Sequence, residues 1–304
     1  MNYRLLGTFG SFSPQKEDYE KSDVVIVPVG YEESTCYIPG TKFGPGAIIE
    51  ASHYMEFYDI EMDCDVSRSI GIYTTSEPEF SKDSMDKAMG EIESFVGRYV
   101  REGKFVVTLG GEHSITPPLL RAFKGVHGDL SVLQFDAHGD MRDSYEGSRQ
   151  SHACAMRRSR EICPVVQVGI RSMCLEEADF LRRNGLAGTV HYAKDVDSWD
   201  DDAIIGSLSE NVYITFDFDY FDPSIMPSVG TPEPGGPDWY RTLRLLRRCF
   251  EKRNVVGVDA VELCPAAGCE HASFTAASLI YKMITYKFAP LVKQGNRGGI
   301  SKKN

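Results

Sequence analysis

Carboxylate and imidazole side chains, the groups that bind metal ions and move protons, gather where four apolar runs of this chain end. The four segments and their polar residues are 105–114 with Glu112 and His113, 130–143 with Asp136, His138, Asp140 and Asp143, 212–222 with Asp217, Asp219 and Asp222, and 255–263 with Asp259 and Glu262. Alternate residues of an extended chain share one side, which places Asp136, His138 and, if the extension continues, Asp140 together. The same period of two pairs Asp217 with Asp219. Carboxylates this close repel each other and lose hydration unless a cation neutralises them.

Four aspartates and two histidines are more ligands than one ion needs, and they fit two ions that share bridging carboxylates. Oxygen ligands with some imidazole favour Mn²⁺ over Zn²⁺, because zinc sites contain more thiolate or histidine and fewer ligands. Two such ions lower the pKa of a shared water enough to yield hydroxide near neutral pH. The pattern therefore predicts a dinuclear metallohydrolase with two Mn²⁺ per subunit.

Each of these short patterns also has a simpler interpretation. A single Asp-x-Asp or His-x-Asp at a strand end is more often a turn or a helix cap than a ligand pair. A calcium loop would suit 217–222, but the glycine and the final glutamate of an EF-hand loop are missing. The metal hypothesis depends on the convergence of three strand ends in one sheet.

The apolar runs themselves are rich in β-branched residues, which is typical of strands covered on both faces. The six runs are 23–30, 105–111, 130–138, 165–170, 212–219 and 255–263. Helical spacing of apolar residues occurs between them, over 85–99, 239–250 and 274–288. This alternation predicts one α/β domain over 1–304 with a mostly parallel sheet between helices, and a frayed basic end at 294–304. Ligands of such sheets bind beyond the carboxyl ends of the strands.

Composition excludes several classes of protein. The chain has 304 residues and a formal net charge of −11, which would repel nucleic acid and anionic lipid. No apolar run is long enough for a membrane helix, and the first residues lack the apolar region of a signal peptide. The eight cysteines form no Cys-x-x-Cys pair, as expected of reduced thiols in a cytoplasmic protein. A small cationic substrate suits this charge.

Six motifs extend the pattern along the chain: GGEHS (110–114), DAHGDMRD (136–143), SHACAMRR (151–158), FDFDYFDPS (216–224), GTPEPGG (230–236) and VELCP (261–265). In this order they resemble the signatures of the ureohydrolases, the family of arginase and agmatinase. The segments 39–52 and 167–180 are similar to agmatinase-type members. The resemblance implies a three-layer arginase-like fold with an eight-stranded sheet, and hydrolysis of a guanidino group to urea and an amine. It also implies a homo-oligomer, commonly a trimer or hexamer.

The resemblance also implies a role for each metal ligand. His113 and Asp140 would bind one ion, and His138 and Asp219 would complete the second. Asp136 and Asp217 would touch both ions. Asp140 would also accept a hydrogen bond from the attacking hydroxide.

Two further residues match catalytic positions of the family. His152 corresponds to a histidine that passes a proton to the leaving amine, which suits an imidazole that titrates near neutrality. Glu262 corresponds to a glutamate that holds the guanidinium through charge-assisted hydrogen bonds. Without the motifs, an exposed histidine and a solvated glutamate would be the default interpretation of both. Supporting or turn roles are expected for Glu112, Asp143, Asp222 and Asp259.

The segment 143–153 indicates the substrate. It lacks the asparagine pattern of arginases, which disfavours arginine and favours agmatine, with putrescine and urea as products. Glu146 is a candidate contact for a distal amine, whereas Arg149 could instead pair with a carboxylate. Ala153 replaces a glycine common in the family, and Ser228 and Val229 (228–229) replace a glycine and a threonine, so the loop shape around the substrate differs.

Three other functions would also fit these motifs. A sibling enzyme would act on aminopropylagmatine, guanidinobutyrate, arginine or formiminoglutamate. A deacetylase on the related fold would use one Zn²⁺ and fewer ligands than the six found here. A catalytically silent relative would act as a binding or scaffold subunit, and such proteins are expected to lose a ligand or the proton-transferring histidine.

Overall fold

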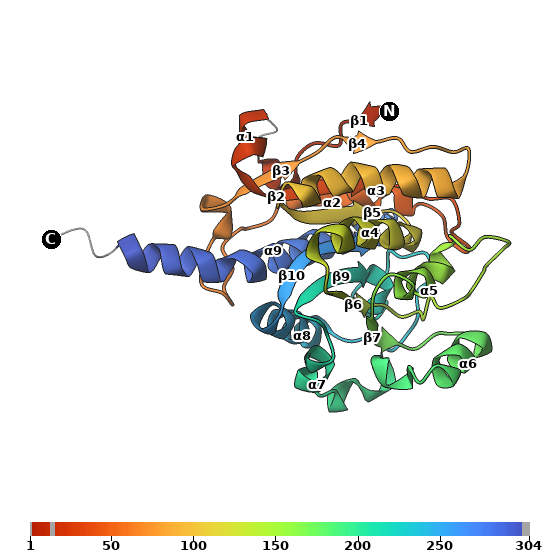
Figure 1. Ribbon diagram of the computed structural model, residues 1–304. Coiled ribbons are helices and arrows are strands. Elements are labelled where there is room, and N and C mark those ends of the chain that lie inside the picture. Colours follow the sequence, from red (N-terminus) through yellow and green to blue (C-terminus); the bar gives the residue numbers. More distant parts are fainter. Residues whose placement is uncertain (1, 13–15, 300–304) are drawn as a thin grey trace.

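A sheet of eight strands, all paired in parallel, forms the centre of the protein (Figure 1). The computed structural model describes residues 2–12 and 16–299. The strands are β2 Ser22–Val29, β3 Gly71–Thr74, β5 Phe105–Gly110, β6 Leu130–Phe135, β7 Val165–Ile170, β8 Val190–Tyr192, β9 Asn211–Asp217 and β10 Asn254–Val261. Their order across the sheet is β3-β2-β5-β10-β9-β6-β7-β8. Two short strands, β1 (Tyr3–Arg4) and β4 (Glu77–Pro78), form a separate antiparallel pair.

Helices cover both faces of this sheet. The α-helices are α1 Lys16–Lys21, α2 Gly44–Ser52, α3 Met85–Arg101, α4 Thr116–His127, α5 Ala155–Arg160, α6 Leu175–Arg183, α7 Asp201–Gly206, α8 Trp239–Lys252 and α9 Glu270–Gly299. The 3-10 helices are η1 Phe9–Ser11, η2 Thr41–Phe43, η3 Val66–Arg68, η4 His113–Ile115, η5 His152–Cys154, η6 Ala187–Thr189, η7 Ala193–Ser198 and η8 Phe218–Tyr220.

Two hydrophobic cores result, one on each face of the sheet. Val24 and Ile26 of β2 join the core that contains α2, α7, α8 and α9. Val25 and Val27, which point the other way, join the core of α3, α4, α5 and α6. Because both faces of the strands are buried, the runs contain few polar residues, and the predicted three-layer α/β architecture is confirmed.

The predicted elements agree with the structure except at their ends and at the sheet edges. All six predicted strands are present, but β6 and β9 end before His138 and Asp219. The edge strands β3 and β8 were not predicted, because they are short and partly exposed. Helix α3 ends at Arg101, two residues beyond the predicted range, and Gly103, whose φ is 74°, follows it. Helix α9 continues to Gly299, into the segment expected to fray, and residues 300–304 lie outside the described residues.

Two expectations from composition can be compared with the structure. Among the described helices, none combines the length and apolar character needed to cross a membrane. All eight cysteines lie within the described residues, and none of them forms a disulfide there.

Close packing of β7 against the end of β9 predicts the effect of adding one methyl group. Gly169 has a φ of 91°, and a Cβ there would lie 2.4 Å from the ring of Tyr220 and 2.9 Å from the carbonyl oxygen of Asp136. We expect Gly169→Ala to lower the free energy of unfolding by about 2 kcal/mol or more, measured by urea denaturation. The control is Gly90→Ala on the exposed side of α3, where no described atom lies within 4 Å. The control should gain about 0.5–1 kcal/mol, and equal stability of both variants would contradict the packing argument.

Candidate metal centre and active site

Four strands, β5, β10, β9 and β6, lie next to each other at the centre of the sheet (Figure 1). Most of the polar residues singled out in the sequence follow their carboxyl ends. His113 follows β5, Glu262 follows β10, and Asp136 follows β6. Asp217 ends β9 and is paired in register with Val261 of β10. Parallel strands in register bring these residues, distant in sequence, to one edge of the sheet.

After β6 and after β9 the backbone turns, and the side chain of an aspartate at the strand end stabilises each turn. Asp136 accepts a hydrogen bond from the backbone N–H of His138, and Asp217 accepts one from the N–H of Asp219. Aspartates commonly form such bonds to the residue two positions on. The alternation expected for an extended chain is therefore wrong beyond Asp136 and Asp217. The pairs come together because the backbone turns around the first carboxylate.

Two site residues have an unusual backbone conformation. Asp140 has a φ of 49° and Glu262 a φ of 66°, in the left-handed region that non-glycine residues rarely adopt. The extended conformation does not continue to Asp140, yet its carboxylate reaches the same cluster, 3.1 Å from His113. Glu262 is held by the backbone N–H of His113, which donates to its Oε1 at 2.6 Å. Backbone strain of this kind is often found at functional sites, although Ser11, Asp63 and Glu146 also have a positive φ outside the cluster.

The structure brings together two groups of possible metal ligands that share one residue. His113, Asp136 and Asp140 form the first group, and Asp136, His138 and Asp219 form the second. In the first, Nδ1 of His113 lies 3.2 Å from Asp136 Oδ2. In the second, Nδ1 of His138 lies 2.8 Å from Asp219 Oδ2 and 3.7 Å from Asp136 Oδ1. Asp217 Oδ2 lies 3.4 Å from His113 Nδ1, which adds a fourth residue to the first group.

The imidazole of His113 is oriented for a cation. The Thr215 hydroxyl donates to the buried Asp259 at 2.6 Å, so Thr215 Oγ1 accepts the Nε2–H of His113 at 2.9 Å. In the neutral imidazole this leaves a lone pair on Nδ1. Nδ1 forms no hydrogen bond with any described residue, although three carboxylate oxygens lie within 3.4 Å. A nitrogen lone pair that converges with carboxylate oxygens is the donor set of a metal site, and an outer hydrogen bond to the other ring nitrogen is its usual support.

The charges of the cluster point to the same conclusion. Burial, with the charges of Asp219 and Asp140, raises the pKa of Asp136 to about 7. Burial and the charge of Asp219 also raise the pKa of Asp217 well above its usual value. Burial opposes charge on both His138 and Asp219, but their contact raises the pKa of His138 to about 11 and lowers the pKa of Asp219 to about 2. Burial also opposes charge on His113, but the carboxylates around it raise the pKa of that imidazole. Without cations the cluster balances its charge by holding protons on both histidines and on the carboxylates with a raised pKa, whereas two divalent cations would replace those protons and balance the four aspartates.

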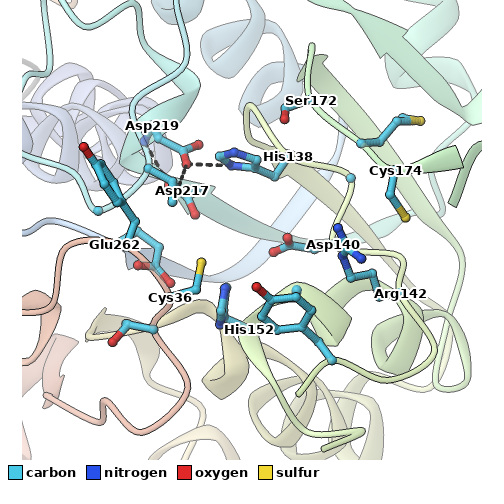
Figure 2. Close-up of a pocket in the computed structure, with 18 of the residues that line it drawn as sticks. Cys36, His138, Asp140, Arg142, His152, Ser172, Cys174, Asp217, Asp219 and Glu262 are labelled. Carbon is cyan, nitrogen blue, oxygen red and sulfur yellow. Dashed lines mark hydrogen bonds and ion pairs between the residues drawn. The ribbon is translucent and has the colours of Figure 1, made fainter. Parts of the chain in front are cut away.

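A cavity of about 300 Å³ opens over this cluster. Figure 2 shows the residues that face it: His138, Asp140, Asp217, Asp219, His152 and Glu262. His152 begins η5 and lies edge-on to Tyr145, with ring centroids 5.8 Å apart. The two residues expected to act on the substrate therefore share one cavity with the metal-binding groups.

The two loop charges considered for the distal end of the substrate lie elsewhere. Neither Glu146 nor Arg149 belongs to the cavity wall. Arg149 pairs with Asp143 at 3.1 Å and with Glu161 at 3.4 Å on the surface.

Several other residues line the cavity instead. Arg142 and Tyr145 line the cavity, with the guanidinium carbon 5.1 Å from the centre of the Tyr145 ring. Cys36 and Ala153 line it too, as do Gly230 and Thr231 (230–231) of the predicted substrate-side loop. Arg142 is part of a quoted motif and could have been noticed. Tyr145 lies in segment 143–153, which the sequence already linked to the substrate, whereas Cys36 follows no strand end or motif and had no such signal.

The four carboxylates with expected supporting roles make hydrogen bonds within the protein. Asp143 pairs with Arg158, and Asp222 accepts from Ser224 and from the N–H of Gly235. Asp259 accepts from the hydroxyls of Tyr213, Thr116 and Thr215. Glu112 is fully buried and accepts hydrogen bonds from the Ser114 hydroxyl and from the backbone N–H groups of Glu33 and Ser34.

Comparison with known proteins identifies the class to which this fold and site belong. A model of the Arginase family matches residues 22–285. An N(1)-aminopropylagmatine ureohydrolase of Synechocystis sp. is 40% identical over 280 residues, covering 88% of this chain and 90% of its own. The agmatinase of Pyrococcus horikoshii is 32% identical, covering 92% and 98%. The crystal structure of the agmatine ureohydrolase of Thermoplasma volcanium superposes with a TM-score of 0.81 at 30% identity, covering 92% of this chain and 96% of that one.

These matches define an α/β enzyme of the ureohydrolase class, whose members hydrolyse guanidino groups. The chain belongs to the arginase family. The resemblance found in the motifs is confirmed, and so is the eight-stranded fold that it implied.

Metal binding should be measurable without any substrate. Mn²⁺ added to chelator-treated protein is expected to raise the melting temperature, because a cation in hundredfold excess over its Kd adds about 2.7 kcal/mol of stability. Asp136→Asn should lose affinity at both positions, since Asp136 belongs to both ligand groups. The control is Asp195→Asn, which removes the same charge from a surface ion pair with Lys194. Calorimetry and metal analysis report both effects, and two tightly bound ions in Asp136→Asn would contradict the shared ligand.

Proposed function

We propose that the protein hydrolyses the guanidino group of a linear, amine-ended substrate to urea and an amine. One observation carries the proposal: two histidine–carboxylate groups that share Asp136 border a cavity also lined by His152 and Glu262. A guanidinium is resonance-stabilised and cationic, so attack on its central carbon needs an activated water, a partner for the positive charge and a proton for the leaving amine. The cavity contains residues suited to each task.

We assign the metal ligands as follows: His113, Asp136, Asp140 and Asp217 for the first ion, and Asp136, His138, Asp217 and Asp219 for the second. Mn²⁺ is the proposed metal because most of these ligand atoms are carboxylate oxygens. When bound, the ions would neutralise the aspartates and lower the pKa of a water molecule toward neutrality. Asp140 would accept a hydrogen bond from that water, which orients it toward the substrate.

Glu262 is the proposed partner of the guanidinium. Its Oε1 is held by the N–H of His113, which fixes the carboxylate at the cavity and leaves Oε2 for the substrate. Burial, together with the charge of Glu112, raises the pKa of Glu262 well above its usual value. A bound guanidinium would stabilise the charged carboxylate, and the carboxylate would in turn hold the positive charge of the substrate.

His152 is the proposed proton carrier. It faces the same cavity as Glu262 and Asp140 (Figure 2). Its ring lies edge-on to Tyr145, and its Nδ1 lies 3.1 Å from Ser34 Oγ. An imidazole titrates near neutral pH, so it can take a proton from water and give it to the departing amine.

The substrate we propose is agmatine or its N1-aminopropyl derivative. Agmatine was expected from segment 143–153, and the relatives with these two names support an amine-ended substrate. The relative at 40% identity favours the aminopropyl form over agmatine itself. Arg142 in the cavity wall is the one observation that favours a carboxylate-ended guanidino acid instead.

Assembly into a homotrimer or homohexamer and a cytoplasmic location, with polyamine synthesis as the context, complete the proposal. The assembly and the polyamine context follow from the family resemblance, and the cytoplasmic location from the pattern of reduced thiols.

Urea release by the Mn²⁺-loaded protein tests the reaction and the substrate together. We expect turnover of agmatine and N1-aminopropylagmatine, with little from arginine or 4-guanidinobutyrate. Strong turnover of guanidinobutyrate that is lost in Arg142→Gln would keep the reaction and replace the substrate. Absence of urea from all four compounds, with two ions bound per subunit, would contradict the proposed function.

Single substitutions separate substrate binding from proton transfer. Glu262→Gln should lower kcat/KM about 10- to 100-fold, the value of one charge-assisted hydrogen bond. His152→Ala should lower kcat about 10²- to 10⁴-fold while two ions stay bound. Glu146→Gln, outside the cavity wall, serves as the control and should keep wild-type kinetics. A His152→Ala variant with normal kcat would show that another group carries the proton.

A further inference from the structure

We propose that Ser34 and Glu112 position His152, by holding the proton on Nδ1 of its ring so that Nε2 alone exchanges protons in the cavity. This inference rests on the proposed function, in which His152 carries a proton to the leaving amine. Ser34 and Glu112 do not touch the substrate in this scheme and act only through the histidine.

Glu112 is the fixed end of the arrangement. Its side chain is fully buried, and four donors converge on its two oxygens. Oε2 accepts the backbone N–H groups of Glu33 and Ser34 at 2.7 and 2.6 Å. Oε1 accepts the hydroxyl of Ser34 at 2.9 Å and that of Ser114. A carboxylate can only accept these bonds, so the hydroxyl proton of Ser34 points to Glu112.

The direction of that proton decides the tautomer of His152. With its hydrogen given to Glu112, Ser34 Oγ can only accept from the histidine. It accepts the backbone N–H of His152 at 3.0 Å, and Nδ1 of the ring lies 3.1 Å away. If Nδ1 carried no hydrogen, two lone pairs would face each other at that distance. Ser151 Oγ lies farther from Nδ1, at 3.3 Å, and a hydroxyl can accept as well as donate. A hydrogen on Nδ1 satisfies both contacts, with Ser34 as the nearer acceptor.

Nε2 is then the working nitrogen. It makes no hydrogen bond with the described part of the chain, and the ring lines the cavity (Figure 2). In this tautomer Nε2 accepts a proton from water, and the N–H bond so formed breaks as the proton passes to the nitrogen of the leaving amine. The Nδ1–H bond stays intact throughout, so the histidine returns to its starting form after each turnover.

The same device orients the metal-facing histidine on the other side of the cluster. There the hydroxyl of Thr215 donates to Asp259 and accepts from Nε2 of His113, which frees Nδ1. In both cases a buried carboxylate fixes a hydroxyl, and the hydroxyl selects which ring nitrogen keeps its hydrogen. The two histidines are thus set in opposite tautomers by matching chemistry.

The test compares Ser34→Ala with Ser34→Thr, which keeps a hydroxyl. We expect Ser34→Ala to lower kcat about 10- to 100-fold, within the range of proton-transfer effects, with KM and the two bound ions unchanged. Ser34→Thr should retain most of the wild-type kcat. The control is Ser22→Ala, a buried serine at the opposite end of β2 whose hydroxyl donates to the carbonyl of Tyr19.

A spectroscopic measurement decides the tautomer independently of activity. In ¹⁵N-histidine-labelled protein, the signals of His152 are those missing from His152→Ala. The wild type should show the neutral ring protonated at Nδ1, and Ser34→Ala should show a mixture of both tautomers.

Three results would overturn the inference. The first is a wild-type His152 protonated at Nε2 when neutral. The second is a Ser34→Ala variant with wild-type kcat, and the third is a kcat loss accompanied by loss of metal or a raised KM, which indicates a merely structural role. If Ser34→Ala does not fold, the wild-type tautomer still decides. If the wild type releases no urea, the proposed function fails, whereas the NMR result still reports on the hydrogen-bond chain.

Discussion

Mutual repulsion among four buried aspartates is the constraint on which this structure depends. Two unit charges 4 Å apart interact by about 4 kcal/mol at an effective dielectric constant of 20, and a domain is stable by only about 5–15 kcal/mol. Asp136 and Asp217 lie side by side because β6 and β9 are neighbours in register, so the sheet that makes the fold also forces the charges together. The raised pKa values of both carboxylates express this conflict. A pair of divalent cations would resolve it, and metal binding would then contribute to the stability of the fold.

The turn that follows β5, with Glu112 and His113, contributes to several parts of the site. Glu112 accepts the hydrogen bonds that orient the loop of Ser34, while the next residue, His113, presents Nδ1 to the carboxylates. The backbone N–H of His113 also donates to Glu262, the proposed partner of the guanidinium. A shift of this turn would move the metal ligand, the substrate contact and the support of His152 together. Parallel pairing of β5 with both β2 and β10 keeps the turn in place.

Much of the fold and the cluster could be predicted, because both follow from patterns carried by neighbouring residues. Continuous apolar runs indicated the buried strands, and carboxylates at their ends indicated where the ligands lie. The edge strands β3 and β8 escaped prediction since half-exposed strands lack such runs. The left-handed backbone of Asp140 and Glu262 cannot be read from a sequence pattern. The contact between Ser34 and His152, 118 positions apart in the sequence, cannot be read from it either. Contacts of that kind depend on tertiary packing alone.

The site divides into a part made by the sheet and a part made by loops, and this division bears on specificity. The proposed metal ligands and Glu262 lie at or shortly after the ends of β5, β6, β9 and β10, whose positions are tied to strand register, whereas His152 begins η5. The wall that faces the rest of the substrate comes from loops, including the Arg142–Tyr145 pair, an interaction worth about 0.5–1 kcal/mol when exposed. Changing a loop residue therefore costs little stability and leaves the metal ligands untouched. Such a division would produce relatives that share this fold but act on different guanidino substrates, as the names of the relatives indicate. The loops, rather than the metal centre, would then determine which substrate length and charge the site accepts.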